Sequence, residues 1–188
     1  MTWTEFWNEI YKNNDQLNSL YSSYWHQYTG IGTWQFWVVL VSLVVPLAAV
    51  YFFVDRKRIF ELFFFGYTVH VLWSYTDIAL GRSGYVTHKY FLLPILPNAM
   101  NITASVLPVG FLLLYQYCTN KGKNFYLYTA LLSALFAFVF AQLEEYIGLL
   151  TLQKGMNHFY LFFIDIGIAC MAYWFTKLIL RLKEKAAS

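Results

Sequence analysis

Acidic side chains interrupt long apolar stretches of this sequence. Glu144 and Glu145 follow the uncharged run FYLYTALLSALFAFVF within the segment AQLEEYIG, and Asp165 lies inside the next apolar run. A carboxylate at membrane depth is costly, so it marks a ligand site, an ion pathway or a pairing partner. Such groups can bind a cation, pass protons along a path, or transfer a proton in catalysis.

The composition indicates a membrane protein. Of 188 residues, 59% are hydrophobic and only 12% are charged, which is far more apolar than a soluble domain. The net charge of +3 does not require a nucleic-acid partner, because the basic residues form short clusters beside apolar runs. Cys118 and Cys170 lie in apolar runs without metal-ligand spacing, and we interpret them as packing residues.

Five apolar runs are each long enough for a membrane span, which takes about 20 helical residues. The connections between them are short. The sequence therefore predicts an all-α fold in which residues 31–188 form a five-helix transmembrane bundle with a short basic tail. The runs are Trp34 to Val54, Ile59 to Leu80, Tyr90 to Tyr117, Phe125 to Leu150 and His158 to Leu180.

The distribution of Lys and Arg predicts the orientation. Alternating loops place nine basic residues on one side of the membrane and four on the other, and cytoplasmic loops retain the excess. We therefore expect a multi-pass protein of the plasma membrane with its N-terminus outside and its C-terminus in the cytoplasm.

Residues 1–30 differ from the rest. Aromatic and aliphatic residues recur there at three- and four-residue spacing with polar residues between them, which predicts an amphipathic, aromatic-rich helix. Thr2 and Glu5 have the spacing of a capping box at its start. The helix could lie in the outer interface or pack over the mouth of the bundle as a lid, and the pattern does not distinguish these arrangements.

Helix geometry gathers the polar residues toward the outer leaflet. A rise of about 1.5 Å per residue puts all of the candidate residues in the outer half except His70, which falls near the midplane. Helical spacing also places His70, Trp73 and Asp77 on one face. The predicted ligand-binding residues are His70, Trp73, Asp77, Asn98, Asn101, Glu144, Glu145 and Asp165.

Several of these residues also have purely structural interpretations. Adjacent helical residues point about 100° apart, so only one of the two glutamates faces the interior. We choose Glu144, because Ala141 and Gly148 share its face. Asp77 could instead pair with Arg82 at the helix end.

The remaining polar candidates have structural alternatives too. A single His70 in the membrane is more often a hydrogen-bonded packing residue than a ligand. Asn98 and Asn101 could simply join helices.

Known catalytic and cofactor motifs are missing from the sequence. There is no HExxH, CxxC, GxSxG or phosphate-binding glycine loop, so we expect no cofactor, no metal site and no assignable catalytic residue. The sequence favours a non-enzymatic membrane protein whose pocket binds a small cationic or amphipathic ligand, or a partner helix. A proton or cation transporter or channel, for which a homo-oligomer could supply the missing pore wall, is the second hypothesis, and a lipid-modifying enzyme is the third. Membrane lipids are expected partners in all three.

Three stretches carry a resemblance to a known family. DRKRIFELFFFG, LPNAMNI and AQLEEYIGLL with the final aromatic helix, within Asp55 to Leu180, resemble an uncharacterised family of small multi-pass membrane proteins from spore-forming bacilli and clostridia. The resemblance implies a bacterial plasma membrane and a link to sporulation, and it carries no activity. His70-x-x-Trp73 and the paired glutamates are also similar in kind to the sterol-isomerase and sigma-2-receptor group, whose intramembrane carboxylates hold cationic or lipid-like ligands.

Overall fold

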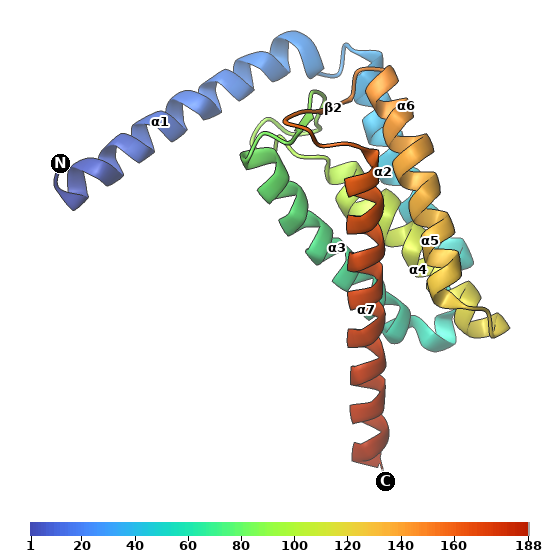
Figure 1. Cartoon of the computed structure of the whole chain (residues 1–188). Helices are drawn as coiled ribbons and strands as arrows, with labels where there is room; N and C mark the ends of the chain where they lie inside the picture. Colours follow the sequence, from blue (N-terminus) through green and yellow to red (C-terminus); the bar gives the residue numbers. More distant parts are fainter. Residues whose placement is uncertain (188) are drawn as a thin grey trace.

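The computed structural model describes residues 1–187 and is mostly helical (Figure 1). Six helical segments are joined by short connections and by one small two-stranded sheet. In chain order the elements are α1 (Trp3–Tyr24), η1 (Trp25–Thr29), α2 (Trp34–Phe53), η2 (Arg56–Arg58), α3 (Ile59–Arg82), β1 (Val86–His88), η3 (Ile102–Val106), α4 (Leu107–Lys121), α5 (Phe125–Leu135), η4 (Phe136–Phe140), α6 (Ala141–Tyr146), β2 (Leu150–Leu152) and α7 (His158–Ala187).

Four helices are long and apolar enough to cross a membrane. They are Trp34–Phe53, Ile102–Lys121, Phe125–Tyr146 and His158–Ala186. Of the five predicted spans, α3 is the one outside this set, although its 24 residues form one continuous helix between α4 and α7. It carries the charged residues Glu61, Asp77 and Arg82.

The predicted third span is wrong at its beginning. The helix was expected from Tyr90, but residues 89–99 form an irregular segment, and helix begins only at Met100. Pro94 and Pro97 explain the difference, because proline donates no backbone hydrogen bond and disfavours helical backbone in the residue before it. Asn98 therefore lies in a loop and shares no helical face with Asn101.

A two-stranded antiparallel sheet joins two loops at one end of the bundle. β1 pairs with β2, so that His88 lies opposite Leu150 and Val86 opposite Leu152. The chain can turn back into β1 because Gly84 adopts a φ of +70°, a conformation that glycine reaches without steric cost. The strands were not predicted, and they hold the loop after α3 against the loop before α7.

Aromatic residues fill the opposite half of the bundle. Phe65 of α3 stacks on Tyr115 of α4 with ring centroids 4.5 Å apart, and Phe125 stacks on Tyr173 at 4.4 Å. Gly66 lets α3 approach α4 closely, since an added Cβ would lie 2.8 Å from Cδ1 of Leu112. This half is therefore a packed core.

α1 projects sideways from the end that carries the sheet (Figure 1). The expected capping box is present, with Thr2 and Glu5 each bonding the other's backbone N–H. None of the helix's residues is buried. Its C-terminal end is tied to the bundle through Phe91, whose carbonyl accepts a hydrogen bond from Trp25 Nε1 at 3.0 Å and whose ring contacts Tyr21 and Tyr24.

Candidate functional site

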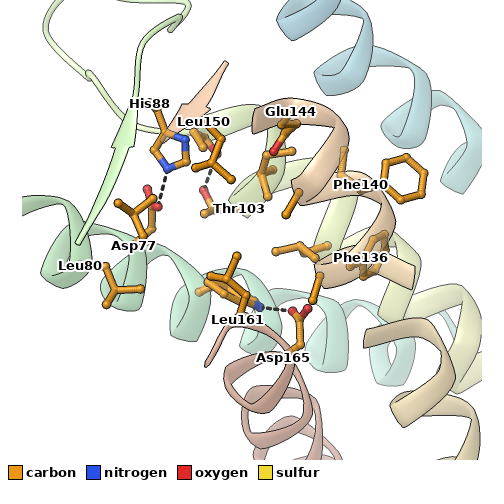
Figure 2. Close-up of a pocket in the computed structure, with 18 residues that line it drawn as sticks. Asp77, Leu80, His88, Thr103, Phe136, Phe140, Glu144, Leu150, Leu161 and Asp165 are labelled. Atoms are coloured by element: carbon orange, nitrogen blue, oxygen red, sulfur yellow. Dashed lines mark hydrogen bonds and ion pairs between the residues drawn. The ribbon is translucent and has the colours of Figure 1, made fainter. Parts of the chain in front are cut away.

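A pocket lies between α3, η3, η4, α6 and α7, beneath the two-stranded sheet (Figure 2). Its free volume is about 70 Å³, which is room for several water molecules or a small polar group. Most of the lining is apolar, including Leu107, Phe136 and Leu161. The polar side chains that face it include Trp73, Asp77, His88, Glu144 and Asp165. Four of these five belong to the predicted set, and His88 is new.

Asp77 and His88 form the first polar pair of the pocket. Nε2 of His88 lies 2.8 Å from Oδ1 of Asp77. The sheet creates this contact, because the pairing of His88 with Leu150 holds the imidazole over the last turns of α3. The suggested partner Arg82 instead lies exposed at the helix end, so the interpretation of Asp77 as its ion-pair partner is wrong.

Burial and nearby charge act in opposite directions on His88. Burial disfavours the imidazolium and lowers its pKa, whereas the hydrogen bond to Asp77 and the charges of Asp77 and Glu144 raise it. The net result is a raised pKa for His88. The charged imidazolium therefore offsets the carboxylate of Asp77 within the pair.

Asp165 forms the second polar pair, at the other end of the pocket. Trp73 Nε1 donates a hydrogen bond of 3.1 Å to its Oδ1. Asp165 is only 2% exposed, and Trp73 and Asp165 are both buried. The indole satisfies one lone pair of one oxygen and supplies no charge, so the carboxylate retains acceptor capacity toward the pocket.

Glu144 faces the pocket without a hydrogen-bond partner. It lies on α6 across from Asp77 and His88, as Figure 2 shows, and within residues 1–187 its carboxylate forms neither a hydrogen bond nor an ion pair. Glu145 points elsewhere, with Oε2 lying 3.5 Å from Nε2 of His158 at the surface. The choice of Glu144 as the inward residue agrees with this geometry, whereas Glu145 does not line the pocket.

Two π-helical segments contribute to the wall. η3 supplies Ile102, Thr103 and Val106, and η4 supplies Phe136 and Phe140 among others. A π-helical turn inside an α-helix shifts the phase of the side chains that follow it, and such turns are frequent at functional sites. On the helix Phe125–Tyr146, η4 directly precedes the turn that carries Glu144.

Besides Glu145, three predicted residues lie outside this pocket. His70 Nδ1 is 2.9 Å from the carbonyl oxygen of Thr103, and its ring lines a separate groove with Tyr67. The amide of Asn101 donates a 2.8 Å hydrogen bond to Ser42 Oγ, which joins two helices. Asn98 lies half-buried in the loop before η3. The structural interpretations of His70 and Asn101 match these contacts.

Metal ligation finds no support in the described part of the chain. Residues 1–187 contain no group of three or more His, Cys, Asp or Glu side chains arranged to hold a metal ion. The pocket chemistry therefore consists of three carboxylates, one imidazole and one indole N–H in apolar surroundings.

The chain has no detectable similarity to known proteins in three comparisons: no protein-family model, no curated protein and no solved structure matches it.

Proposed function

We propose that this chain is an integral membrane protein whose outer pocket binds a small ligand with a cationic group on an apolar body. One observation carries the proposal: the half-buried Glu144 carboxylate faces an apolar pocket and has no hydrogen-bond or ion-pair partner among residues 1–187. A polar group that is partly removed from water without a hydrogen-bond partner costs free energy. A ligand that supplies the missing partner would recover that cost on binding.

The charged side chains of the pocket favour a cationic ligand. Asp77 and His88 neutralise each other when the imidazole is charged. Neither Glu144 nor Asp165 forms an ion pair with a basic residue: the charge of His88 acts on Glu144 without a direct contact, and Asp165 is bonded only by the uncharged indole of Trp73. A protonated amine could donate hydrogen bonds to the Glu144 carboxylate, and charge-assisted hydrogen bonds are the stronger kind.

The size and lining of the pocket limit the ligand. With about 70 Å³ of free volume, the pocket admits a small head group and excludes a helix, so a partner helix is not the favoured occupant. The apolar walls suit alkyl or ring carbons around the charged atom.

The placement in the membrane is part of this proposal. We propose that α3 crosses with the four more apolar helices, which gives five spans and agrees with the nine-to-four distribution of Lys and Arg. The pocket then opens toward the outer side of a bacterial plasma membrane. The direction of α1, sideways from that end (Figure 1), suits a helix lying in the outer interface.

The packing in the other half of the bundle favours a binding role over a transport role. The stacked pairs Phe65–Tyr115 and Phe125–Tyr173 lie between the pocket and the basic end, and Tyr115 and Phe65 are fully buried. An ion would need polar groups or water along this route. Packed rings offer neither.

The test compares two adjacent glutamates. Purified full-length protein in phosphatidylcholine nanodiscs is titrated with butylamine, and the bound amine is counted by native mass spectrometry. Glu144→Gln removes one carboxylate from the pocket, and Glu145→Gln makes the same chemical change on the surface. We expect Glu144→Gln to weaken amine binding about 30-fold or more, since removing one partner of a buried charged pair costs about 2 kcal/mol or more.

Two controls define the outcome. Glu145→Gln should bind like the wild type, and butanol, which has the same chain without the charge, should not bind. Equal amine binding by wild type and Glu144→Gln would contradict the proposal.

A further inference from the structure

A second groove lies directly behind one wall of the pocket. It runs along α2 on the surface of the bundle, with a volume of about 560 Å³ and an almost wholly apolar lining. Its lining includes Trp37, Val38, Val41, Val45, Val106 and Phe140. Val106 and Phe140 also line the carboxylate pocket, so these two side chains are the partition between the two spaces.

The partition consists of two side chains, and the side chain of Phe140 can change its rotamer. Phe140 is 47% exposed although it lines the pocket, and Figure 2 shows it at the edge away from Asp77 and His88. It belongs to η4, and Val106 belongs to η3, so both partition residues lie on π-helical turns. A phenylalanine side chain on a lipid-facing surface can change rotamer without breaking a hydrogen bond.

In the proposed membrane placement, the partition lies at the depth of the lipid acyl chains. Val41 lies seven residues into α2, about 10 Å below its outer end, and Phe140 lies fifteen residues into its helix, about 22 Å above the inner end. In a hydrocarbon layer of about 30 Å, both positions are about 8 to 10 Å below the outer boundary. Glu144 is one helical turn above Phe140, nearer to the head groups.

The geometry points to a side entrance from the outer leaflet. We propose that the groove holds the apolar tail of a single-chain cationic amphiphile whose charged head reaches Glu144 past Phe140. This inference rests on the proposed function, and it specifies the ligand class and its route. The groove and the pocket share Val106 and Phe140 as lining residues, so a tail in the groove ends next to a head group in the pocket.

Blocking the groove tests the binding of the apolar tail separately from the binding of the charged head. Val41 is 55% exposed in the groove, so Val41→Trp fills the groove without disturbing the core. Val44 is 52% exposed on the same helix and does not line the groove, so Val44→Trp is the matched control. Each protein is titrated with butylamine and with dodecylamine in phosphatidylcholine nanodiscs, and affinities are compared with the wild type for the same amine, so that partitioning into lipid cancels.

The expected result is specific to one variant and one ligand. Val41→Trp should lower dodecylamine affinity about tenfold and leave butylamine binding unchanged, while Val44→Trp should affect neither. Should Val41→Trp not fold, Val45→Trp blocks the same groove one turn further along.

The outcomes separate this inference from the proposed function. Unchanged dodecylamine binding in Val41→Trp, with butylamine bound normally, would overturn the side entrance and leave the pocket standing. An equal loss of dodecylamine in Val44→Trp would also overturn it, because the effect would come from the general lipid-facing surface. Failure of the wild type to bind either amine would overturn both.

Discussion

Glu61 and Glu144 are both acidic residues near helix ends in an apolar bundle, yet their surroundings are opposite. The carboxylate of Glu61 accepts a 3.0 Å hydrogen bond from Nε of Arg58, a second bond from the same guanidinium, and another from the hydroxyl of Tyr115. Glu144 has none of these within residues 1–187. A carboxylate that the fold satisfies maintains structure, and one that the fold leaves open is available to a ligand.

The bundle therefore divides into a closed half and an open half. Around Glu61, paired charges and stacked rings fill the interior. Around Glu144, a sheet, two π-helical turns and a cavity replace such packing. The comparison predicts that substitutions in the closed half change stability, whereas substitutions in the open half change binding.

The largest effect on stability is expected from Glu61→Gln. The change leaves the Arg58 guanidinium without its counter-charge and weakens the bond to Tyr115. Hydrogen bonds to charged groups contribute about 1.5 to 3 kcal/mol each, so we expect a loss of about 3 kcal/mol, measured by chemical unfolding in detergent micelles. Butylamine affinity of the folded protein should stay unchanged. A Glu61→Gln protein that is as stable as the wild type but binds butylamine more weakly would contradict the division into a closed half and an open half.

A smaller, pH-dependent effect is expected from His88→Gln. The raised pKa of His88 means that the charged imidazolium stabilises the fold. This contribution is fully present below the ordinary pKa of about 6.5 and is lost as the pH rises through the folded-state pKa. His88→Gln should therefore be less stable than the wild type by about 1 kcal/mol near pH 5.5, and the difference should shrink toward pH 9.

The measurement for His88 is thermal unfolding of both proteins at several pH values. His26→Gln, an equivalent change at an exposed position in η1, serves as the control. A stability difference for His88→Gln that grew with pH would mean that the folded state holds the neutral imidazole.

Much of the helical framework could be predicted from the sequence, for physical reasons visible in particular residues. Long apolar runs end at local signals, since Thr33 and Asn124 cap helices with their side chains and Gly122 adopts the left-handed conformation after α4. The choice of Glu144 over Glu145 also followed from helical phase. Local periodicity determines both kinds of feature.

The missed features depend on contacts between distant parts of the chain. β1 and β2 have three residues each, too few for an alternating pattern, and they pair across α4 and α5. His88 was overlooked as a site residue for that reason. The turn at Gly84 was the available signal, because it returns the chain toward Asp77, eleven residues before His88. The start of the third span was also predicted wrongly, because apolar content alone takes no account of Pro94 and Pro97.

Glu145→Gln should have the smallest effect on stability. It makes the same chemical change as Glu144→Gln at the neighbouring position, so it shows how far the effect depends on where the carboxylate lies. Glu145 is adjacent to Glu144, but it is exposed, and its 3.5 Å contact with His158 does not satisfy the imidazole nitrogen as a hydrogen bond. Exposed pairs of this kind contribute about 0 to 1 kcal/mol, so the change in unfolding free energy should be below about 0.5 kcal/mol. Chemical unfolding measures it, beside Glu144→Gln. A larger loss would mean that Glu145 and His158 hold α6 against α7, so that the open half of the bundle also depends on a charged pair for its stability.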